Sequence, residues 1–397
     1  MIFVALADSM IFGMWMAPTE APVGRLLQNV GNYIKAHPQD AQGYYILGRL
    51  HSLLFAVETK TIGVYQKTLD GLPSLPPDQS IIVKRQGGNN LAKIARDHLL
   101  ESIRGYRRAT ELAPDQPMAF LGLGWMLESG ADFAQYLGAP PGDRQAGKDA
   151  SAWKTSALNA YRKAYGLSIS ADIKRDSLGP GADSAISLEA GEGIVRILSA
   201  RKPIPQEGKE ITTVRDSIAK LKQMPHAVTP IIFPLDRNAA LDDLLDHKRI
   251  VRFDLDGDGQ AEWWPWVKPE TGILVWDPKR TGHVESGLQL FGSVTWWMAW
   301  QHGYQPLAAL DDDQDGWLCG KELDGLVVWQ DRNNNGLSER GEVLPVQSHR
   351  IRAIAATAQV NRNGVFFNPK GIRLNDGTTL PTYDWTPVEV KTLASNL

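Results

Sequence analysis

Two segments near the C-terminus carry the same order of side chains, and they restrict the local fold more than any other feature of the chain. Each begins with Asp, has Asp or Asn at its third and fifth positions, Gly at its sixth and Glu at its twelfth. The first starts at Asp311 and the second at Asp331. Oxygen atoms at positions 1, 3 and 5 can face one point, and Gly at position 6 permits a sharp turn. The pattern therefore predicts two loops that each wrap around a cation.

The oxygen donors of both loops favour calcium. Carboxylate, amide and backbone carbonyl oxygens are the usual ligands of Ca²⁺, and a Glu at position 12 can bind the ion with both oxygens. We expect the first loop to bind more tightly, because the second offers one carboxylate fewer when Glu339 coordinates only through water. The expected ligands are Asp311, Asp313, Asp315, Trp317 (carbonyl) and Glu322 in the first loop, and Asp331, Asn333, Asn335, Leu337 (carbonyl) and Glu342 in the second.

A third acidic segment lies between two runs that are typical of strands. Asp254, Asp256, Asp258 and Glu262 form a D-x-D-x-D-G-x-x-E pattern. Pro265 stands at position 12, where its side chain cannot bind an ion, so the segment is not a full calcium loop of the same type. We expect it to bind a third calcium ion, as strand-loop-strand sites do. The alternative is an acidic hairpin turn whose glycines supply positive φ.

The spacing of the two complete loops argues against a calcium switch. Only residues 323–330 separate them, which corresponds to about two helical turns. This is too short for the separate helices of a standard EF-hand pair, so we expect a loop, a short helix and a second loop. Such a unit does not suit a helix-opening movement. We expect calcium to act structurally, by neutralising clustered carboxylates and coupling ion binding to folding.

The N-terminal half contains a repeated order of aromatic, leucine and small residues. Small residues let antiparallel helices approach closely, and a proline separates one hairpin from the next. The spacing resembles the tetratricopeptide repeat, which implies a surface for an unidentified protein partner. A generic helical bundle is the alternative. The repeated residues are Pro38, Tyr44, Leu47 and Gly48; Pro114, Phe120, Leu123 and Gly124; Ser102, Tyr106 and Ala109; and Ala157, Tyr161 and Ala164.

These patterns predict an α+β protein with several domains. The composition changes after residue 225, where short β-like runs begin, and ten of the 13 tryptophans lie beyond residue 260. We divide the chain into an apolar arm or leader remnant at 1–22, tetratricopeptide-like helices at 23–170, a helical connector at 171–225, and a Trp-rich β module with the calcium loops at 226–397.

From residue 230 to residue 344 the order of segments resembles the module of bacterial iron-regulated and hemolysin-type calcium-binding proteins. The resemblance covers about 115 residues and implies an EF-type calcium module, in a family that is mostly of unassigned function. One loop departs from the pattern: Lys279 and Thr281 replace small oxygen ligands in the segment 277–288, so we expect no ion there. The matching segments are 230–233, 253–259, 266–267, 290–292, 309–311, 328–331 and 341–344.

Composition and motifs give little support for other classes of function. A net charge of −3 and a pI near 6.3 do not suggest a nucleic-acid partner. A single cysteine, Cys319, excludes an internal disulfide framework and a Cys-based zinc site. The segment 142–148 resembles a phosphate-binding loop, but Asp149 stands where that motif needs Ser or Thr. We therefore predict that the protein is not an enzyme.

Two alternative functions remain open. Clustered tryptophans either stack on sugars in a carbohydrate-binding module or fill the core, and the exposure of their rings separates the two. A cryptic hydrolase would need a deep pocket with paired carboxylates outside the loops; a calcium-triggered break at the labile Asp277-Pro278 bond is a minor variant. The clustered tryptophans are Trp263, Trp264, Trp266, Trp296, Trp297 and Trp300.

The first 17 residues are apolar except for Asp8 and Ser9. They lack the basic start of a signal peptide, although the segment 5–7 resembles a small-x-small cleavage end. We interpret them as the remnant of a longer leader or as an apolar arm packed on the first helices. They are too short to span a bilayer convincingly. We expect a bacterial protein in the periplasm or outside the cell, where millimolar calcium would fill even weak loops, with a cytoplasmic location as the alternative.

Overall fold

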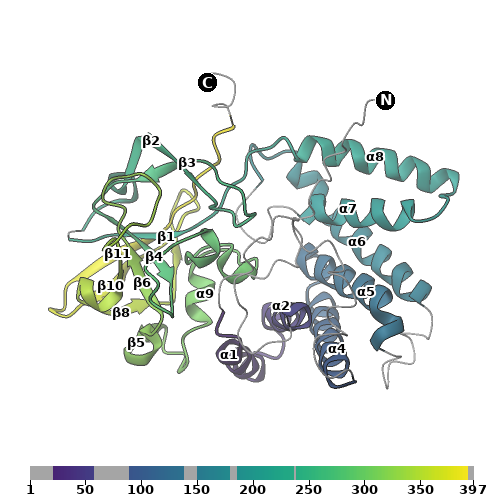
Figure 1. Cartoon of the computed structure of the whole chain (residues 1–397), viewed down its shortest axis with the longest axis horizontal. Helices are drawn as coiled ribbons and strands as arrows, with labels where there is room; N and C mark the ends of the chain where they lie inside the picture. The colour runs from purple at the N-terminus through teal and green to yellow at the C-terminus, as the bar shows by residue number, and fades with distance from the viewer. Residues whose placement is uncertain (1–20, 58–88, 138–149, 179–185, 237, 392–397) are drawn as a thin grey trace.

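The structure, a computed structural model, has a helical half and a β-rich half that lie side by side (Figure 1). The expected α+β class is confirmed. The expectations for the apolar N-terminal segment and for the phosphate-loop-like segment lie outside the described residues. Among the helices that are described, none is both long and apolar enough to cross a membrane. The described residues are 21–57, 89–137, 150–178, 186–236 and 238–391.

In the helical half, each helix packs against its neighbour in the sequence. A core of aliphatic, alanine and aromatic side chains runs from the second of these helices to the last. The connector predicted at 171–225 contributes two of the helices. The helices are α1 (Val23–Ala36), α2 (Ala41–Val57), α4 (Asn89–Leu112), α5 (Pro117–Leu137), α6 (Ala150–Asp172), α7 (Ile186–Ser199) and α8 (Pro205–Leu221).

Buried tyrosines pack directly on glycine backbone in this half. Tyr106 of α4 lies between Gly48 of α2 and Gly122 of α5, where an added Cβ would meet its ring at 3.0 and 2.4 Å. Tyr161 of α6 lies against Gly124 of α5 in the same way, at 2.7 Å. The small and aromatic residues of the repeated pattern therefore meet between helices. Assignment of the helices to the tetratricopeptide family stays a prediction.

This packing makes one glycine far more sensitive to substitution than another. Gly122→Ala should lower the stability of the helical half by about 1–3 kcal/mol, because the new methyl group overlaps the Tyr106 ring. Gly166→Ala is the matched control: its Cβ would meet nothing within 4 Å, and it should stabilise α6 by about 1 kcal/mol. Thermal melting followed by circular dichroism tests both. Equal melting temperatures for the two variants would contradict the predicted packing.

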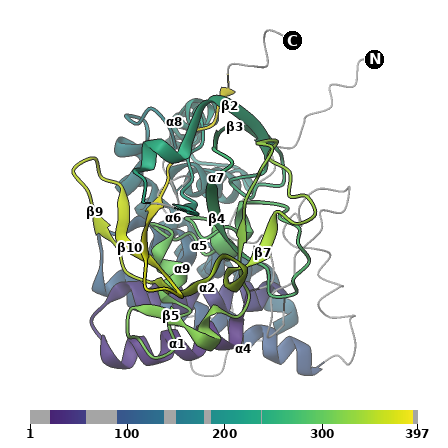
Figure 2. The same cartoon turned by 90° about the vertical axis from the view of Figure 1, so that its left-hand side faces the viewer.

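The β-rich half is a curled antiparallel sheet with a separate two-stranded ribbon (Figure 2). The strand order is β5-β8-β10-β11-β1-β4-β6-β7, with β9 paired to β10, and β2 and β3 form the ribbon. The strands are β1 (Ile231–Pro234), β2 (Leu245–Phe253), β3 (Glu262–Val267), β4 (Thr271–Trp276), β5 (Trp317–Cys319), β6 (Leu326–Trp329), β7 (Val343–Pro345), β8 (Ile351–Ala355), β9 (Gln359–Val360), β10 (Phe366–Leu374) and β11 (Thr379–Asp384).

The core of the β-rich half continues into the first two helices. Leu26 of α1 and Leu53 of α2 belong to the same buried cluster as Phe233 of β1 and Ile354 of β8. Figure 1 shows α1 and α2 between the sheet and the remaining helices. The two helices therefore cover one side of the sheet, although they lie almost 200 residues before its first strand in the sequence.

The clustered tryptophans mostly fill the core. Trp264, Trp266, Trp296 and Trp300 are at most 1% exposed, while Trp263 and Trp297 are half-buried. Trp266 packs edge-on against Trp329 with a ring-centroid distance of 5.5 Å, a favourable geometry for aromatic rings. Most of these rings are therefore not available to stack on a sugar, and the exposed aromatic face that would favour a carbohydrate-binding module is not formed by them.

A buried arginine joins the two halves. Arg49 of α2 is 1% exposed, and its Nε and Nη2 donate to the carbonyl oxygen of Trp297 at 3.0 and 2.5 Å. Trp296, Trp297 and Ala299 all have positive φ, between 53° and 56°. Such a conformation is unfavourable for bulky residues and persists where surrounding contacts enforce it. Arg49 supplies one of these contacts from the helical half.

Candidate metal centres

The two complete loops share a pattern of hydrogen bonds around their first residue. Gly316 N–H donates to Asp311 Oδ2 at 2.8 Å, and Gly336 N–H donates to Asp331 Oδ2 at the same distance. The side chains at positions 3 and 5 accept the N–H groups of positions 5 and 7 in both loops. The glycines have φ of 86° and 73°, as the turn requires. The sequence pattern therefore specifies the same backbone turn twice.

The glutamate at position 12 closes each loop in the same way. Glu322 accepts the N–H groups of Asp312 at 2.7 Å and Cys319 at 2.9 Å. Glu342 accepts the corresponding N–H groups, from the second and ninth residues of its loop, at 2.8 and 3.1 Å. Glu322 is 9% and Glu342 5% exposed. Both carboxylates are therefore held at the loop by its own backbone.

Strands and short turns, rather than pairs of α-helices, flank these loops. The first follows the five-residue helix α9 (Tyr304–Ala308) and leads into β5, and Glu322 lies on the 3-10 turn η5 (Gly320–Leu323). The second connects β6 to β7. The prediction of a short helix between the loops is wrong, because this segment forms strand β6. Val327 and Val328 suit a strand, and β6 pairs with β4 and β7.

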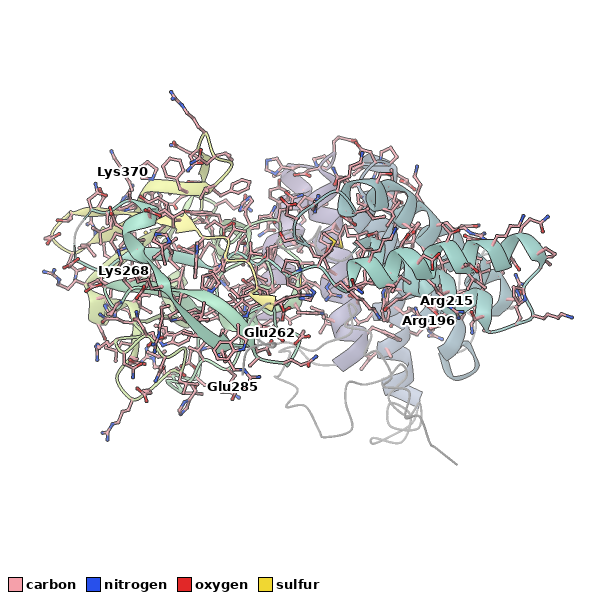
Figure 3. The ribbon with its side chains drawn as sticks, turned by 90° about the horizontal axis from the view of Figure 1, so that it is seen from above. Arg196, Arg215, Glu262, Lys268, Glu285 and Lys370 are labelled. Atoms are coloured by element: carbon pink, nitrogen blue, oxygen red, sulfur yellow. The ribbon has the colours of Figure 1, made fainter. Side chains whose placement is uncertain are left out.

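The third acidic segment lies in the connection between β2 and β3 and repeats the first half of the turn. Gly259 N–H donates to Asp254 Oδ2 at 3.0 Å, and Asp258 N–H donates to Asp256 Oδ1 at 3.2 Å. Glu262 completes a group of four acids whose ligand atoms lie within 4.8 Å of one another. Figure 3 shows Glu262 at the side of the β-rich half that faces the helices. The fold therefore brings together the four side chains that were predicted as ligands of the third site.

Three buried carboxylate oxygens in these loops lack a hydrogen-bond donor among the described residues. They are Asp254 Oδ1, Glu262 Oε2 and Asp311 Oδ1. An unsatisfied buried acceptor is costly, and crowded carboxylates repel one another. A cation in the loop at Asp254 or in the loop at Asp311 would bind these oxygens and reduce the repulsion between the carboxylates. The residues present therefore fit calcium. Asp311, Asp313 and Asp315 also form a compact acidic group.

The loop at Asp331 differs in this respect. Asp331 is completely buried, and both of its carboxylate oxygens accept hydrogen bonds. One donor is the indole Nε1 of Trp266, at 2.7 Å from Oδ2. Asn333 donates from Nδ2 to Glu339 Oε2 at 2.6 Å. Both carboxylate oxygens of Asp331 are therefore satisfied by the protein itself, and the expected weaker binding of this loop stays a prediction.

The electrostatics of the third segment reflect the same crowding. Burial, together with the charges of Asp256 and Asp258, raises the pKa of Asp254 to about 8. Burial also raises the pKa of Glu262 to about 9, with the three aspartates adding to the shift. In the loop that begins at Asp311, called loop 311 below as the segment from Asp254 is called loop 254, burial raises the pKa of Asp311. The ionised forms of Asp254, Glu262 and Asp311 are thus disfavoured unless a positive charge is present.

The segment 277–288, which lacks the ligand pattern, forms the same kind of turn around its first aspartate. Asp277 Oδ1 accepts the N–H of Thr281 at 3.0 Å and Oδ2 accepts that of Gly282 at 2.9 Å. Lys279 is exposed at position 3. Val284 N–H donates to Ser338 Oγ at 2.8 Å, so this loop pairs with the loop at Asp331. The side chain of Asp277, which precedes Pro278, is thus fixed by hydrogen bonds from the backbone of its own loop.

Several residues that contact the loops could not be found from the loop patterns. His226 Nδ1 lies 2.6 Å from Asp256 Oδ2, and Trp266 donates to Asp331. Arg25 and Asn29, from helix α1, donate to Asp312. His226 is the first residue of the β module, 30 residues before its partner, and Arg25 and Asn29 lie nearly 300 residues before theirs. Only the three-dimensional fold brings them to the loops.

The raised pKa values predict how the ion-free protein responds to pH. The folded state holds its protons on Asp254 and Glu262 to about pH 8–9, whereas the unfolded chain releases them near pH 4. Stability should therefore fall as pH rises between these values, because the unfolded state then binds fewer protons. Glu262→Gln should reduce this fall in the presence of a chelator. Melting temperatures from pH 5 to 9 test it, and an unchanged slope would contradict the prediction.

Comparison with known proteins places the loops that begin at Asp254, Asp277, Asp311 and Asp331 in one matched region. A sequence profile of the SPM domain matches residues 232–385, from β1 to just beyond β11. The chain is also similar to the iron-regulated protein FrpA of Neisseria meningitidis serogroup C, with 32% identity over 117 residues. This match covers 28% of the chain and 10% of FrpA, so the chain spans about a tenth of that relative's length. The expected resemblance to an iron-regulated protein is confirmed at this level. The C-terminal region of the chain therefore carries an SPM domain.

Proposed function

We propose that the SPM domain of this chain binds calcium through the loops at Asp254, Asp311 and Asp331, and that calcium acts mainly as a structural ion. The observation that carries the proposal is the set of buried carboxylate oxygens in the loops at Asp254 and Asp311 that receive no hydrogen bond from the described residues. The loop at Asp331 is included because it repeats the turn of the loop at Asp311. Crowded oxygen ligands without nitrogen or sulfur favour a hard cation, and the flexible, high coordination number of Ca²⁺ suits these loops.

A structural role follows from where the loops lie. Loop 254 closes the β2-β3 ribbon, and the loop at Asp331 connects two paired strands of the main sheet. Loop 311 leads directly into β5, which pairs with β8. An ion in any of these loops would stabilise a strand connection, because the ligands converge only when the strands are in register. The flanking strands offer no pair of helices that could open as in a calcium switch.

The helical half is proposed as a surface for a protein partner. Support comes from its stacked hairpins, which bury their small and aromatic residues between helices, as helical repeats with a binding surface do. We further propose that the protein is not an enzyme and works outside the cytoplasm, where calcium is plentiful. The similarity to FrpA supports only the calcium part of this proposal, and only through a related segment.

The two alternatives receive less support. Four of the six clustered tryptophan rings are buried, which weakens the carbohydrate-binding alternative. A cavity of about 410 Å³ lies between α1, α2 and loop 311, but Asp311 is the single carboxylate in its lining. A hydrolase that uses paired carboxylates is therefore not supported by this cavity.

Calcium titration calorimetry on the full chain after chelator treatment tests the proposal. We expect three sites, with one site lost in each of Asp254→Ala, Asp311→Ala and Asp331→Ala. Calcium at 100 times the dissociation constant of a site should stabilise the fold by about 2.7 kcal/mol. Asp376→Ala, at an exposed turn between β10 and β11, is the control and should keep every site.

Two results would contradict the proposal. The first is the absence of both binding heat and thermal stabilisation at millimolar calcium. The second is an equal loss of binding in the Asp376→Ala control, because that would indicate diffuse attraction by surface charge rather than specific loops. Magnesium serves as a second probe, since a rigid octahedral ion should bind these loops more weakly.

A further inference from the structure

Helix α1 reaches one calcium loop from outside the SPM domain. Asn29 Nδ2 donates to Asp312 Oδ1 at 2.8 Å and to the carbonyl oxygen of Ala309 at 3.1 Å. These two residues stand on either side of the loop's entry, just before and just after its first ligand, Asp311. The side chain of Asn29 thus spans the point where the chain enters the loop. It is 8% exposed, so its amide has little access to water.

Arg25, one helical turn before Asn29, contacts the same part of the loop. Its Nε donates to Asp312 Oδ1 at 2.7 Å, and its Nη2 donates to the carbonyl oxygen of Leu310. The Arg25 side chain is 21% and the Asp312 side chain 48% exposed, so water screens this ion pair. Asp312 Oδ1 thus accepts from both residues of α1, and Asn29 is its more buried donor.

The contact is relayed to the glutamate that closes the loop. Asp312 receives Asn29 on its side chain, and its backbone N–H donates to Glu322 Oε1 at 2.7 Å. Glu322 is the position-12 residue, which would bind calcium with both oxygens. Asn29 therefore fixes the residue that orients a ligand, without itself reaching the ion. Groups that hydrogen-bond a metal ligand directly typically change metal affinity by about 10–100-fold when they are removed, and Asn29 acts on Glu322 through one further residue.

The loop at Asp331 provides an internal comparison. Arg332 occupies position 2, and its N–H donates to Glu342 Oε1 at 2.8 Å, as in the first loop. The side chain of Arg332, however, donates through Nε to Gln330 Oε1, at the end of its own strand. The two loops thus have the same internal hydrogen bonds, but their second residues are supported from different parts of the chain.

Packing around the α1 contact is open on one side. The cavity of about 410 Å³ is lined by Asn29 and Val30 of α1 and by Asp311 and Gln314 of the loop. Leu26 of α1 packs in the core shared with the sheet, whereas the side of α1 that bears Asn29 borders this cavity. The directional hydrogen bonds of Asn29 and Arg25 therefore connect α1 to the loop itself.

We infer that Asn29 is a positioning residue for the ion site of loop 311, so that calcium binding there is coupled to the docking of α1. The inference rests on the proposed calcium function. Because coupling between two equilibria is reciprocal, calcium must hold α1 on the loop as strongly as α1 improves calcium binding. The loop therefore links the ion to the helical half, which the SPM domain does not include.

Calcium calorimetry on the full chain tests the first half of this linkage. Asn29→Leu removes the amide and keeps a side chain of similar size, and it should weaken one site by about 10–100-fold while the others keep their affinity. Asn32→Leu makes the same change at an exposed position of the same helix and should leave every site unchanged. An isotherm of folded Asn29→Leu that matches the native protein overturns the inference. Absence of calcium binding by the native protein overturns the proposed function as well, so the two failures are distinct.

Hydrogen exchange tests the second half. Calcium should slow amide exchange in α1 of the native protein, and this calcium-dependent protection should disappear in Asn29→Leu. A purely structural role for Asn29 would change exchange equally with and without calcium. If Asn29→Leu does not fold, Asp312→Ala removes the acceptor of the same hydrogen bonds from a half-exposed position and should weaken the same site. Exchange in α1 that is independent of calcium overturns the coupling.

Discussion

The β-rich half depends on the balance of negative charge in two of its loops. Four carboxylates converge between β2 and β3, and three more converge before β5, with buried oxygens that receive no hydrogen bond from the described residues. Folding concentrates this charge, because each loop turns its acidic side chains towards one point. Under the proposed function, the free energy of the fold is therefore tied to the cation that these loops hold. Backbone N–H groups supplied by the turns offset part of the repulsion, as at Asp311 and Gly316.

The sequence was most informative where local geometry determines the structure. Gly at position 6, side-chain acceptors at positions 1, 3 and 5, and Glu at position 12 specified the turns correctly, because each bond lies within one loop. The pairing of Tyr106 with Gly48 was also predictable in kind, since a ring needs a residue without Cβ on the facing helix. The region of resemblance to iron-regulated proteins followed from the order of such local motifs.

Long-range placement could not be predicted from the same residues. The segment between the two complete loops forms β6 because it pairs with β4 and β7. Val327 and Val328 favour a strand, but the spacing of the loops does not reveal these distant pairing partners. The burial of Trp264 and Trp266 depends on the sheet around them. Asn29 and Arg25 looked like ordinary polar residues of an amphipathic helix. Their partner, Asp312, lies at a non-ligand position, so neither end of the contact carried a signal.

The segment at 277–288 separates two properties that calcium loops usually combine. Its backbone follows the same turn as the loops at Asp254, Asp311 and Asp331, with Asp277 accepting from Thr281 and Gly282. The turn is therefore stable through its peptide groups and one aspartate, and ion ligands are an addition to it. A chain of this kind can lose an ion from one loop through substitution at positions 3 and 5 and still keep its strands connected. Dependence on calcium can thus change loop by loop during evolution, while the architecture of the sheet stays the same.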